Sequence, residues 1–322
     1  MRVVESLIKK KLKEIPQIEL IILGGSVARG DETEHSDIDI NFFAKKNFLP
    51  EEKRKFYKYL GKYIEESYLP VEDFKLNDLH GESLVLFDKN NLTKKRKTNK
   101  SEKEKNTIFL KKWNQAKKYF SLAERKYKKK QYDSALLHLI GTKSLAFILV
   151  HSLPERFDLP FPSFRLFDSI KKVGKKLKNR KIFEYTKMIY QINNSNSELI
   201  LSNFEKIYRI MGKCYKNKHP VCKNWGFYDP IKIKYNIQGL RITFSTYPKE
   251  YALRFIIGCI MDWSLGSEDL WKIKENKKYW KKVTQLTKEI LGEKEFDEKL
   301  AKKKLEITRC LKKEIEKSLL KI

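Results

Sequence analysis

The chain has 322 residues, 41% of them hydrophobic, and its 70 Lys and Arg against 41 Asp and Glu give a net charge of +29. This length predicts two or three domains with a buried core, and four cysteines are too few for a disulfide framework. The first residues, MRVVESLIKKKLKEI, have charges throughout an amphipathic pattern, which predicts a helix rather than a signal peptide.

Residues 1–92 predict a small α+β domain. An apolar run ends at Gly24-Gly25, SDIDINFF alternates like a half-buried strand, and the segment that opens with Pro50 predicts a helix. The expected elements are a helix at 5–15, strands at 18–25 and 36–43, a helix at 50–68, and strands at 69–76 and 82–88. This order predicts a mixed sheet with helices on one face.

The rest of the chain predicts a polar linker followed by a mainly helical region. Residues 93–106 contain no apolar side chain, so we expect a linker or an exposed arm there. Residues 107–322 have helical periodicity, and a break near 218–230 would divide them into two subdomains. The expected helices are 107–129, 131–152, 178–192, 196–217, 248–265, 267–291 and 294–321. Residues 231–246 instead alternate on both sides of Gln238-Gly239 and predict a hairpin.

The most apolar stretch, residues 134–153, contains His138 and Lys143. It therefore predicts a buried helix rather than a membrane span. With the sparse cysteines, this favours a cytoplasmic protein without a membrane partner.

The basic charge is unevenly distributed. Residues 1–92 carry 15 Lys and Arg against 17 Asp and Glu, a net charge of −2, whereas the remaining residues carry 55 against 24, a net charge of +31. A lysine-rich surface typical of thermophiles or an AT-rich genome would not leave the first domain slightly acidic. The asymmetry favours a basic binding surface for a nucleic acid on the second part of the chain.

Two aspartates suggest a metal site. Asp37 and Asp39 lie two residues apart on a predicted strand, so both carboxylates project from one face. They repel one another unless a cation lies between them. Magnesium suits this pair because it is often held by one or two carboxylates together with substrate phosphates.

The glycine turn before these aspartates suggests a phosphate site. Gly24 and Gly25 leave room for a triphosphate to approach the backbone. Ser26 offers a hydroxyl and a backbone N–H at the start of the next helical turn, where anions bind well. Arg29, three residues on, can reach the same phosphate.

Three short motifs carry a resemblance to a known family. Gly24-Gly25-Ser26, Arg29-Gly30 and Ser36-Asp37-Ile38-Asp39 resemble the motif of the DNA polymerase beta-like nucleotidyltransferase superfamily, most closely its minimal and aminoglycoside-nucleotidyltransferase branch. The resemblance covers about residues 18–90. It implies that Asp37 and Asp39 hold two Mg²⁺ ions, with an NTP as substrate. It places the nucleotide at Gly24, Gly25, Ser26, Arg29 and Ser36.

The family also needs a third carboxylate from a nearby strand. LPVEDFKLND supplies Glu72 and Asp73. Alignment with the branch's usual pattern puts Glu72 in the catalytic and metal-binding place, whereas strand alternation would expose Asp73 instead. Both remain candidates.

The favoured function is transfer of a nucleoside monophosphate from an NTP to a hydroxyl, with release of pyrophosphate. The charge asymmetry favours an RNA acceptor, such as a tRNA-like molecule. The alternatives are a small molecule or a protein side chain as acceptor, as in antibiotic-modifying or toxin-neutralising members, and a non-catalytic RNA-binding protein on a transferase scaffold. The complete set of carboxylates argues against the last alternative.

Overall fold

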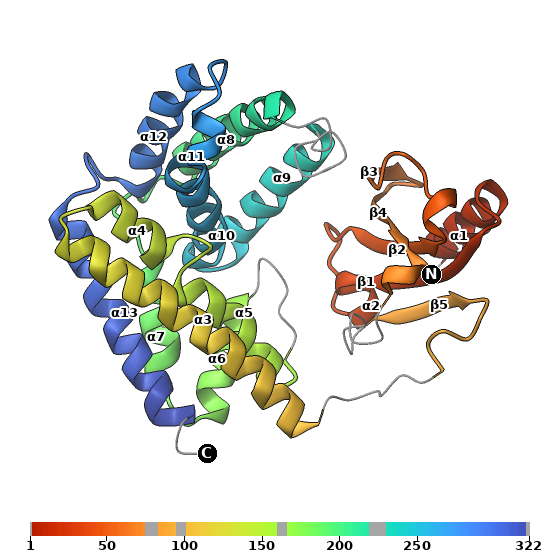
Figure 1. The fold of residues 1–322 in the computed structure, drawn as a ribbon, viewed down its shortest axis with the longest axis horizontal. Coiled ribbons are helices and arrows are strands. Elements are labelled where there is room, and N and C mark those ends of the chain that lie inside the picture. Colours follow the sequence, from red (N-terminus) through yellow and green to blue (C-terminus); the bar gives the residue numbers. More distant parts are fainter. Residues whose placement is uncertain (1, 75–82, 95–100, 160–165, 219–229, 320–322) are drawn as a thin grey trace. The chain divides into compact units, whose positions relative to one another are not determined.

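The computed structural model describes residues 2–74, 83–94, 101–159, 166–218 and 230–319. The chain forms two compact units (Figure 1). The first consists of Met1–Lys100 and His219–Tyr235, and the second of Ser101–Lys218 and Asn236–Ile322. The fold is α+β, with the described strands in the first unit and mainly helices in the second.

The first unit is built on a mixed five-stranded sheet with the order β3-β4-β2-β1-β5. The helices of this part are α1 (Arg2–Glu14) and α2 (Gly25–Arg29), and the strands are β1 (Ile18–Gly24), β2 (Ile38–Ala44), β3 (Arg54–Tyr59), β4 (Lys62–Pro70) and β5 (Leu84–Asp88). Strands β2 and β4 pair in parallel, and the other neighbours are antiparallel. The predicted strands 18–25, 36–43 and 82–88 correspond to β1, β2 and β5.

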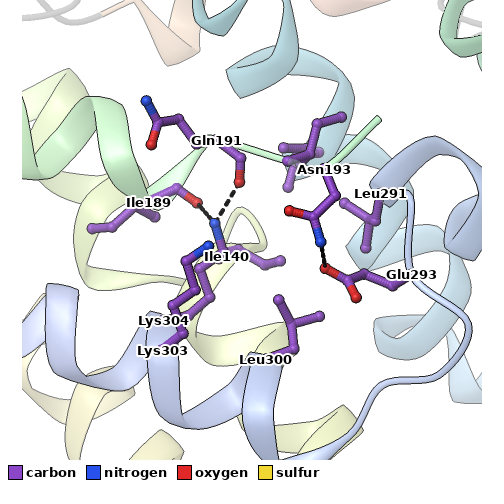
Figure 2. Close-up of a pocket in the computed structure, with 11 residues that line it drawn as sticks. Ile140, Ile189, Gln191, Asn193, Leu291, Glu293, Leu300, Lys303 and Lys304 are labelled. Atoms are coloured by element: carbon purple, nitrogen blue, oxygen red, sulfur yellow. Dashed lines mark hydrogen bonds between the residues drawn. The ribbon is translucent and has the colours of Figure 1, made fainter. Parts of the chain in front are cut away.

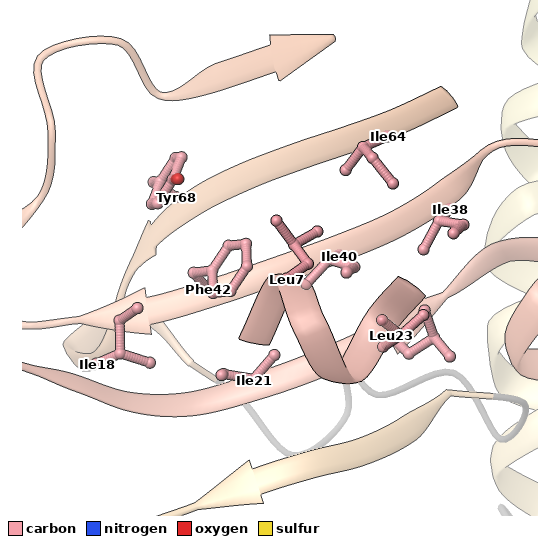
Figure 3. Packing of buried hydrophobic residues seen from close by; sticks show 10 residues of the cluster. Leu7, Ile18, Ile21, Leu23, Ile38, Ile40, Phe42, Ile64 and Tyr68 are labelled. Atoms are coloured by element: carbon pink, nitrogen blue, oxygen red, sulfur yellow. The ribbon is translucent and has the colours of Figure 1, made fainter. Parts of the chain in front are cut away.

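One face of this sheet packs against α1 because apolar residues recur along the helix at helical spacing (Figure 3). Leu7 is fully buried and lies over Ile21 and Ile40, while Ile64 and Tyr68 extend the same core onto β4. The opposite face of β1 and β2 carries a smaller cluster. Every second residue of β2 therefore points away from the α1 core.

The helix predicted at 50–68 is wrong, because this segment forms the hairpin β3–β4. Leu60 and Gly61 make its two-residue turn, with φ values of 47° and 81°. The apolar residues Phe56 and Ile64 are also compatible with helical spacing, but both are buried in the sheet while Leu60 is 67% exposed. The strand predicted at 69–76 is also wrong. Strand β4 ends at Pro70, Val71–Asp73 form a single 3₁₀ turn, and residues 75–82 lie outside the described part.

The second unit is built from helices of very different length, which carry its core. They are α3 (Glu102–Lys128), α4 (Tyr132–Ile140), α5 (Leu145–Arg156), α6 (Leu166–Lys176), α7 (Lys181–Ile189), α8 (Ser197–Lys218), α10 (Glu250–Met261), α11 (Glu268–Trp271), α12 (Lys277–Leu291) and α13 (Glu298–Leu319). A π-helical turn at Asp262–Gly266 follows α10. Helix α3 begins inside the predicted linker, because Ser101 and Glu104 form a capping box at its start.

The hairpin predicted at 231–246 is wrong, because these residues belong to the helix α9 (Pro230–Thr246). Its buried residues Ile233, Ile237 and Leu240 recur at helical spacing, which overrides the alternation seen in the sequence. Residues up to Tyr235 belong to the first unit and the remainder of α9 to the second.

The apolar stretch Tyr132–Arg156 is long and apolar enough to cross a membrane by composition. In the structure it is divided into α4 and α5, and 61% of its most apolar window is buried within the protein. Ser144 caps the start of α5 by accepting a hydrogen bond from the Phe147 N–H. The stretch therefore packs inside the second unit, as the sequence predicts, but as two helices rather than the single helix expected at 131–152.

A buried lysine donates hydrogen bonds at the C-terminal end of α7 (Figure 2). Lys304 on α13 is 3% exposed, and its Nζ donates hydrogen bonds to the carbonyls of Ile189 at 2.7 Å and Gln191 at 2.6 Å. The last carbonyls of a helix have no partner within the helix. Lys304 supplies the missing donors.

Candidate active site

The glycine turn between β1 and α2 brings the backbone against the second strand. Gly25 has φ +66°, and a Cβ added there would lie 1.8 Å from Asp39 Oδ2. Neither the backbone angle nor the space suits a larger residue. Gly24 pairs with Asp39 in the antiparallel ladder of β1 and β2. The predicted glycine turn thus lies directly beside the predicted carboxylates.

Three carboxylates converge at this turn. One oxygen each from Asp37, Asp39 and Glu65 lie within 4.8 Å of one another. Asp39 on β2 and Glu65 on β4 are register partners in the parallel pair, and partners in neighbouring strands project from the same face. Asp37 immediately precedes β2. We call these residues the carboxylate triad.

The carboxylate that the structure brings to Asp37 and Asp39 is Glu65, which the sequence did not single out. Glu72 and Asp73 lie on the 3₁₀ turn after β4, and the structure does not bring either of them to Asp37 and Asp39. Glu72 Oε1 instead accepts a hydrogen bond of 3.4 Å from the backbone N–H of Lys46. The physical reason is that the parallel partner of β2 is β4, which begins at Lys62, seven residues before the strand expected at 69–76. Glu65, rather than Glu72, therefore pairs with Asp39.

The neighbouring residue Glu66 points to the other face of β4, as strand alternation requires. It is fully buried, forms an ion pair of 3.2 Å with Lys11, and accepts hydrogen bonds from Tyr57 and Tyr68. The ion pair and the hydrogen bonds compensate the cost of burying the Glu66 carboxylate inside the protein. Glu66 thus belongs to the core beneath α1, and Glu65 belongs to the triad.

The triad is crowded with negative charge. Burial, together with the charges of Asp37 and Glu65, raises the pKa of Asp39 to about 7, and the cations Lys232 and Arg29 only partly oppose this shift. A carboxyl with such a pKa is partly protonated near neutral pH unless a cation stabilises its charged form. Oxygen donors at this spacing and charge suit a hard divalent cation, so the residues fit the magnesium site that the sequence implies.

A lysine from α9 lies among these carboxylates. Lys232 Nζ is 3.0 Å from Asp37 Oδ2 and 2.5 Å from Glu65 Oε2. Burial lowers the pKa of Lys232, but the charges of Asp37 and Glu65 outweigh this effect and raise it, so the side chain is an ammonium. The sequence did not single out Lys232, because only a long-range contact brings it to the triad.

Aromatic side chains line the triad on the same side as Lys232. Tyr235 donates a hydrogen bond of 3.0 Å to Asp37 Oδ1, and its ring stacks on His35 with a centroid distance of 4.6 Å. The rings of Phe56 and Tyr63 lie 5.2 and 5.0 Å from Tyr235. The sequence did not predict this cluster, because the residues of β3 and β4 were predicted to form a helix and those of α9 a hairpin.

The predicted nucleotide-binding side chains lie on the same stretch of chain as Asp37 and Asp39. Ser26 and Arg29 lie on α2, and the charge of Arg29 is near enough to oppose part of the rise in the pKa of Asp39. Arg29 Nε also donates to Asp31 Oδ1 at 3.1 Å. Ser36 Oγ accepts a hydrogen bond of 2.8 Å from the Thr33 N–H, which orders the turn before Asp37. That these residues bind a nucleotide stays a prediction.

Comparison with known proteins bears on this site. Residues 6–103 match the family model described as Polymerase beta, Nucleotidyltransferase. No curated protein and no solved structure matched the chain. The matched segment contains the glycine turn, the carboxylate triad and the five-stranded sheet. The N-terminal part of this chain is therefore a nucleotidyltransferase domain of the polymerase beta superfamily.

Proposed function

We propose that this protein is a Mg²⁺-dependent nucleotidyltransferase that moves a nucleoside monophosphate from an NTP to a hydroxyl of an RNA. The observation that carries the proposal is the carboxylate triad on a polymerase beta-type domain. In this reaction the acceptor oxygen bonds to the α-phosphorus, and the bond from that phosphorus to the α–β bridging oxygen breaks. Pyrophosphate leaves with this electron pair, and the hydroxyl proton passes to a base or to water.

Each group at the site has a proposed role. Asp37, Asp39 and Glu65 are the ligands for Mg²⁺, which when bound would neutralise triphosphate charge and activate the acceptor hydroxyl. We propose two ions, as in other two-metal phosphoryl-transfer sites. Ser26 and Arg29 bind the β- and γ-phosphates, and Gly25 keeps the backbone clear of Asp39.

The RNA acceptor is proposed from charge. The net charge of +31 outside residues 1–92 provides many cations for phosphates. A cavity of about 390 Å³ at the α6–α7 turn concentrates some of them, because Lys171, Lys175, Lys178 and Arg180 line it together with Phe183. Cations around an aromatic ring suit a phosphate backbone with an unstacked base.

The test uses the full-length protein with Mg²⁺, each α-³²P-labelled NTP in turn, and total cellular RNA. We expect label in an RNA band on a denaturing gel, and no label with the Asp37→Asn or Asp39→Asn variant. Label on protein or on a small molecule would replace RNA with that acceptor. No transfer to any acceptor, with normal folding, would leave an RNA-binding protein on a transferase scaffold and contradict the proposal.

RNA binding is tested separately by titrating the same protein with tRNA and with an unstructured RNA from about 50 to 300 mM salt. Contacts with several phosphates predict a log–log slope of about −3 to −6. Absence of binding at the lower salt concentration would rule out RNA as the acceptor.

A further inference from the structure

We propose that Lys232 is an internal counter-ion of the carboxylate triad, which a divalent cation must displace in order to bind. The inference rests on the proposed function because it concerns the same site. It adds to that function a residue, Lys232, that controls how tightly the site binds a divalent cation. The main observation is that the ammonium lies 3.0 Å from Asp37 and 2.5 Å from Glu65. It therefore forms ion pairs with two of the three carboxylates.

The contacts leave Asp37 without a free oxygen. Its Oδ2 accepts from Lys232, and its Oδ1 accepts from the Tyr235 hydroxyl at 3.0 Å. The Asp37 N–H also donates to the Tyr235 hydroxyl at 3.1 Å. A cation held by Asp37 and Glu65 together would lie next to the ammonium that now bridges one oxygen of each.

Lys232 is held in this position from several sides. It is 9% exposed, and its ammonium lies 4.1 Å from the centroid of the Phe56 ring and 5.0 Å from that of Tyr235. Aromatic faces attract a cation, most strongly where water is excluded. The same Tyr235 ring stacks on His35 and so is itself fixed. This arrangement differs from a surface lysine that meets a carboxylate by chance.

The electrostatic consequence is competition. Two cations within a few ångströms repel strongly at the effective dielectric constant of a partly buried site. A bare metal ion must therefore expel the ammonium from its carboxylates and leave it without an anionic partner. A metal ion that arrives with a triphosphate brings such a partner. Lys232 thus disfavours metal binding without nucleotide more than metal binding with nucleotide.

The experiment measures Mn²⁺ binding to the full-length protein by the loss of the free-ion EPR signal, without nucleotide. The test variant is Lys232→Met, which keeps the aliphatic stem and removes the charge. Lys232→Gln serves as a second variant, because its amide still donates to the carboxylates and preserves the fold. The matched control is Lys234→Met, since Lys234 is exposed on the same helix.

We expect both Lys232 variants to bind Mn²⁺ at least tenfold more tightly than the wild type, while Lys234→Met matches the wild type. Their melting temperatures should also rise more on Mn²⁺ addition. Equal Mn²⁺ affinities in the wild type and the Lys232 variants, whether measurable or absent, overturn the proposal. The proposed function is judged independently, because it requires that wild-type protein retain a labelled NTP in a metal-dependent way whatever Lys232 does.

Discussion

Asp39 and Glu65 face one another across the parallel pair of β2 and β4, as register partners on neighbouring strands. The pairing depends on the β3–β4 hairpin. Strand β3 forms the edge of the sheet, and the hairpin turn places β4 between β3 and β2. It places a carboxylate next to Asp39 on the face that carries the glycine turn. The geometry of the triad is therefore a consequence of sheet topology.

The contact between Gly25 and Asp39 leads to a first prediction. A Cβ at Gly25 would lie 1.8 Å from Asp39 Oδ2, so Gly25→Ala should displace this carboxylate and lower metal-dependent NTP retention at least tenfold. Gly30→Ala is the matched control, because Gly30 also has a positive φ, +69°, but nothing within 4 Å of the added Cβ. Both variants should lose about 1 kcal/mol of stability from the backbone angle. Similar NTP retention by the two variants would contradict the steric account.

The turn of the β3–β4 hairpin offers a stabilising change. Leu60 has φ 47° and is 67% exposed, although a two-residue turn with positive φ at both positions prefers Asn-Gly. Leu60→Asn should raise the free energy of unfolding by about 0.5–1 kcal/mol, measured by urea denaturation. Gly61→Ala, at φ 81°, should lower it. A destabilised Leu60→Asn would argue against the turn.

The sequence revealed the part of the site that is local in the chain. Gly24, Gly25, Asp37 and Asp39 follow from one strand–turn–strand pattern, and the structure brings them together. Glu65 was missed because Leu stands at a turn position where Asn would have signalled a hairpin. The helical spacing of the surrounding apolar residues then favoured the wrong element.

The residues that α9 contributes could not be found by local patterns. Lys232 lies 195 residues from Asp37, and Tyr235 lies 198 residues from it. Only tertiary packing sets such contacts, and the alternating apolar residues of 231–246 matched a strand as well as a helix. The repeated helical pattern made α3, α7, α8, α10, α12 and α13 predictable, whereas α6 was not expected as a helix.

The buried amino group of Lys304 should be a main support of the second unit. Lys304→Met leaves the carbonyls of Ile189 and Gln191 without donors in a buried place, so we expect a loss of about 2–3 kcal/mol of stability. Lys303→Met is the control because Lys303 is exposed one position away. Urea denaturation compares the two. An equally small effect of both substitutions would show that the carbonyls find other donors.

A partly buried histidine predicts acid sensitivity. His151 on α5 lies 3.4 Å from Arg254 Nη1, and burial, with the Arg254 charge, lowers the pKa of His151 to about 3. Between pH 6.5 and 3 the unfolded chain binds a proton at His151 that the folded chain does not, so the free energy of unfolding falls as the pH falls.

The wild type should therefore lose about 1–2 kcal/mol more stability between pH 7 and pH 5 than His151→Asn, which cannot titrate in this range. Urea denaturation at the two pH values measures the difference. Parallel losses in the two proteins would mean that His151 accepts a proton in the folded state.

The most direct test of the central claim compares Glu65→Gln with Glu72→Gln in equilibrium dialysis of α-³²P-labelled NTPs with Mn²⁺ and with EDTA. The carboxylate triad predicts metal-dependent retention by the wild type and by Glu72→Gln within about twofold. It predicts at least a tenfold loss in Glu65→Gln, because Glu65 supplies one of the three carboxylates that would hold the cation. Retention that survives in Glu65→Gln and disappears in Glu72→Gln would contradict the account and restore the assignment made from sequence alone.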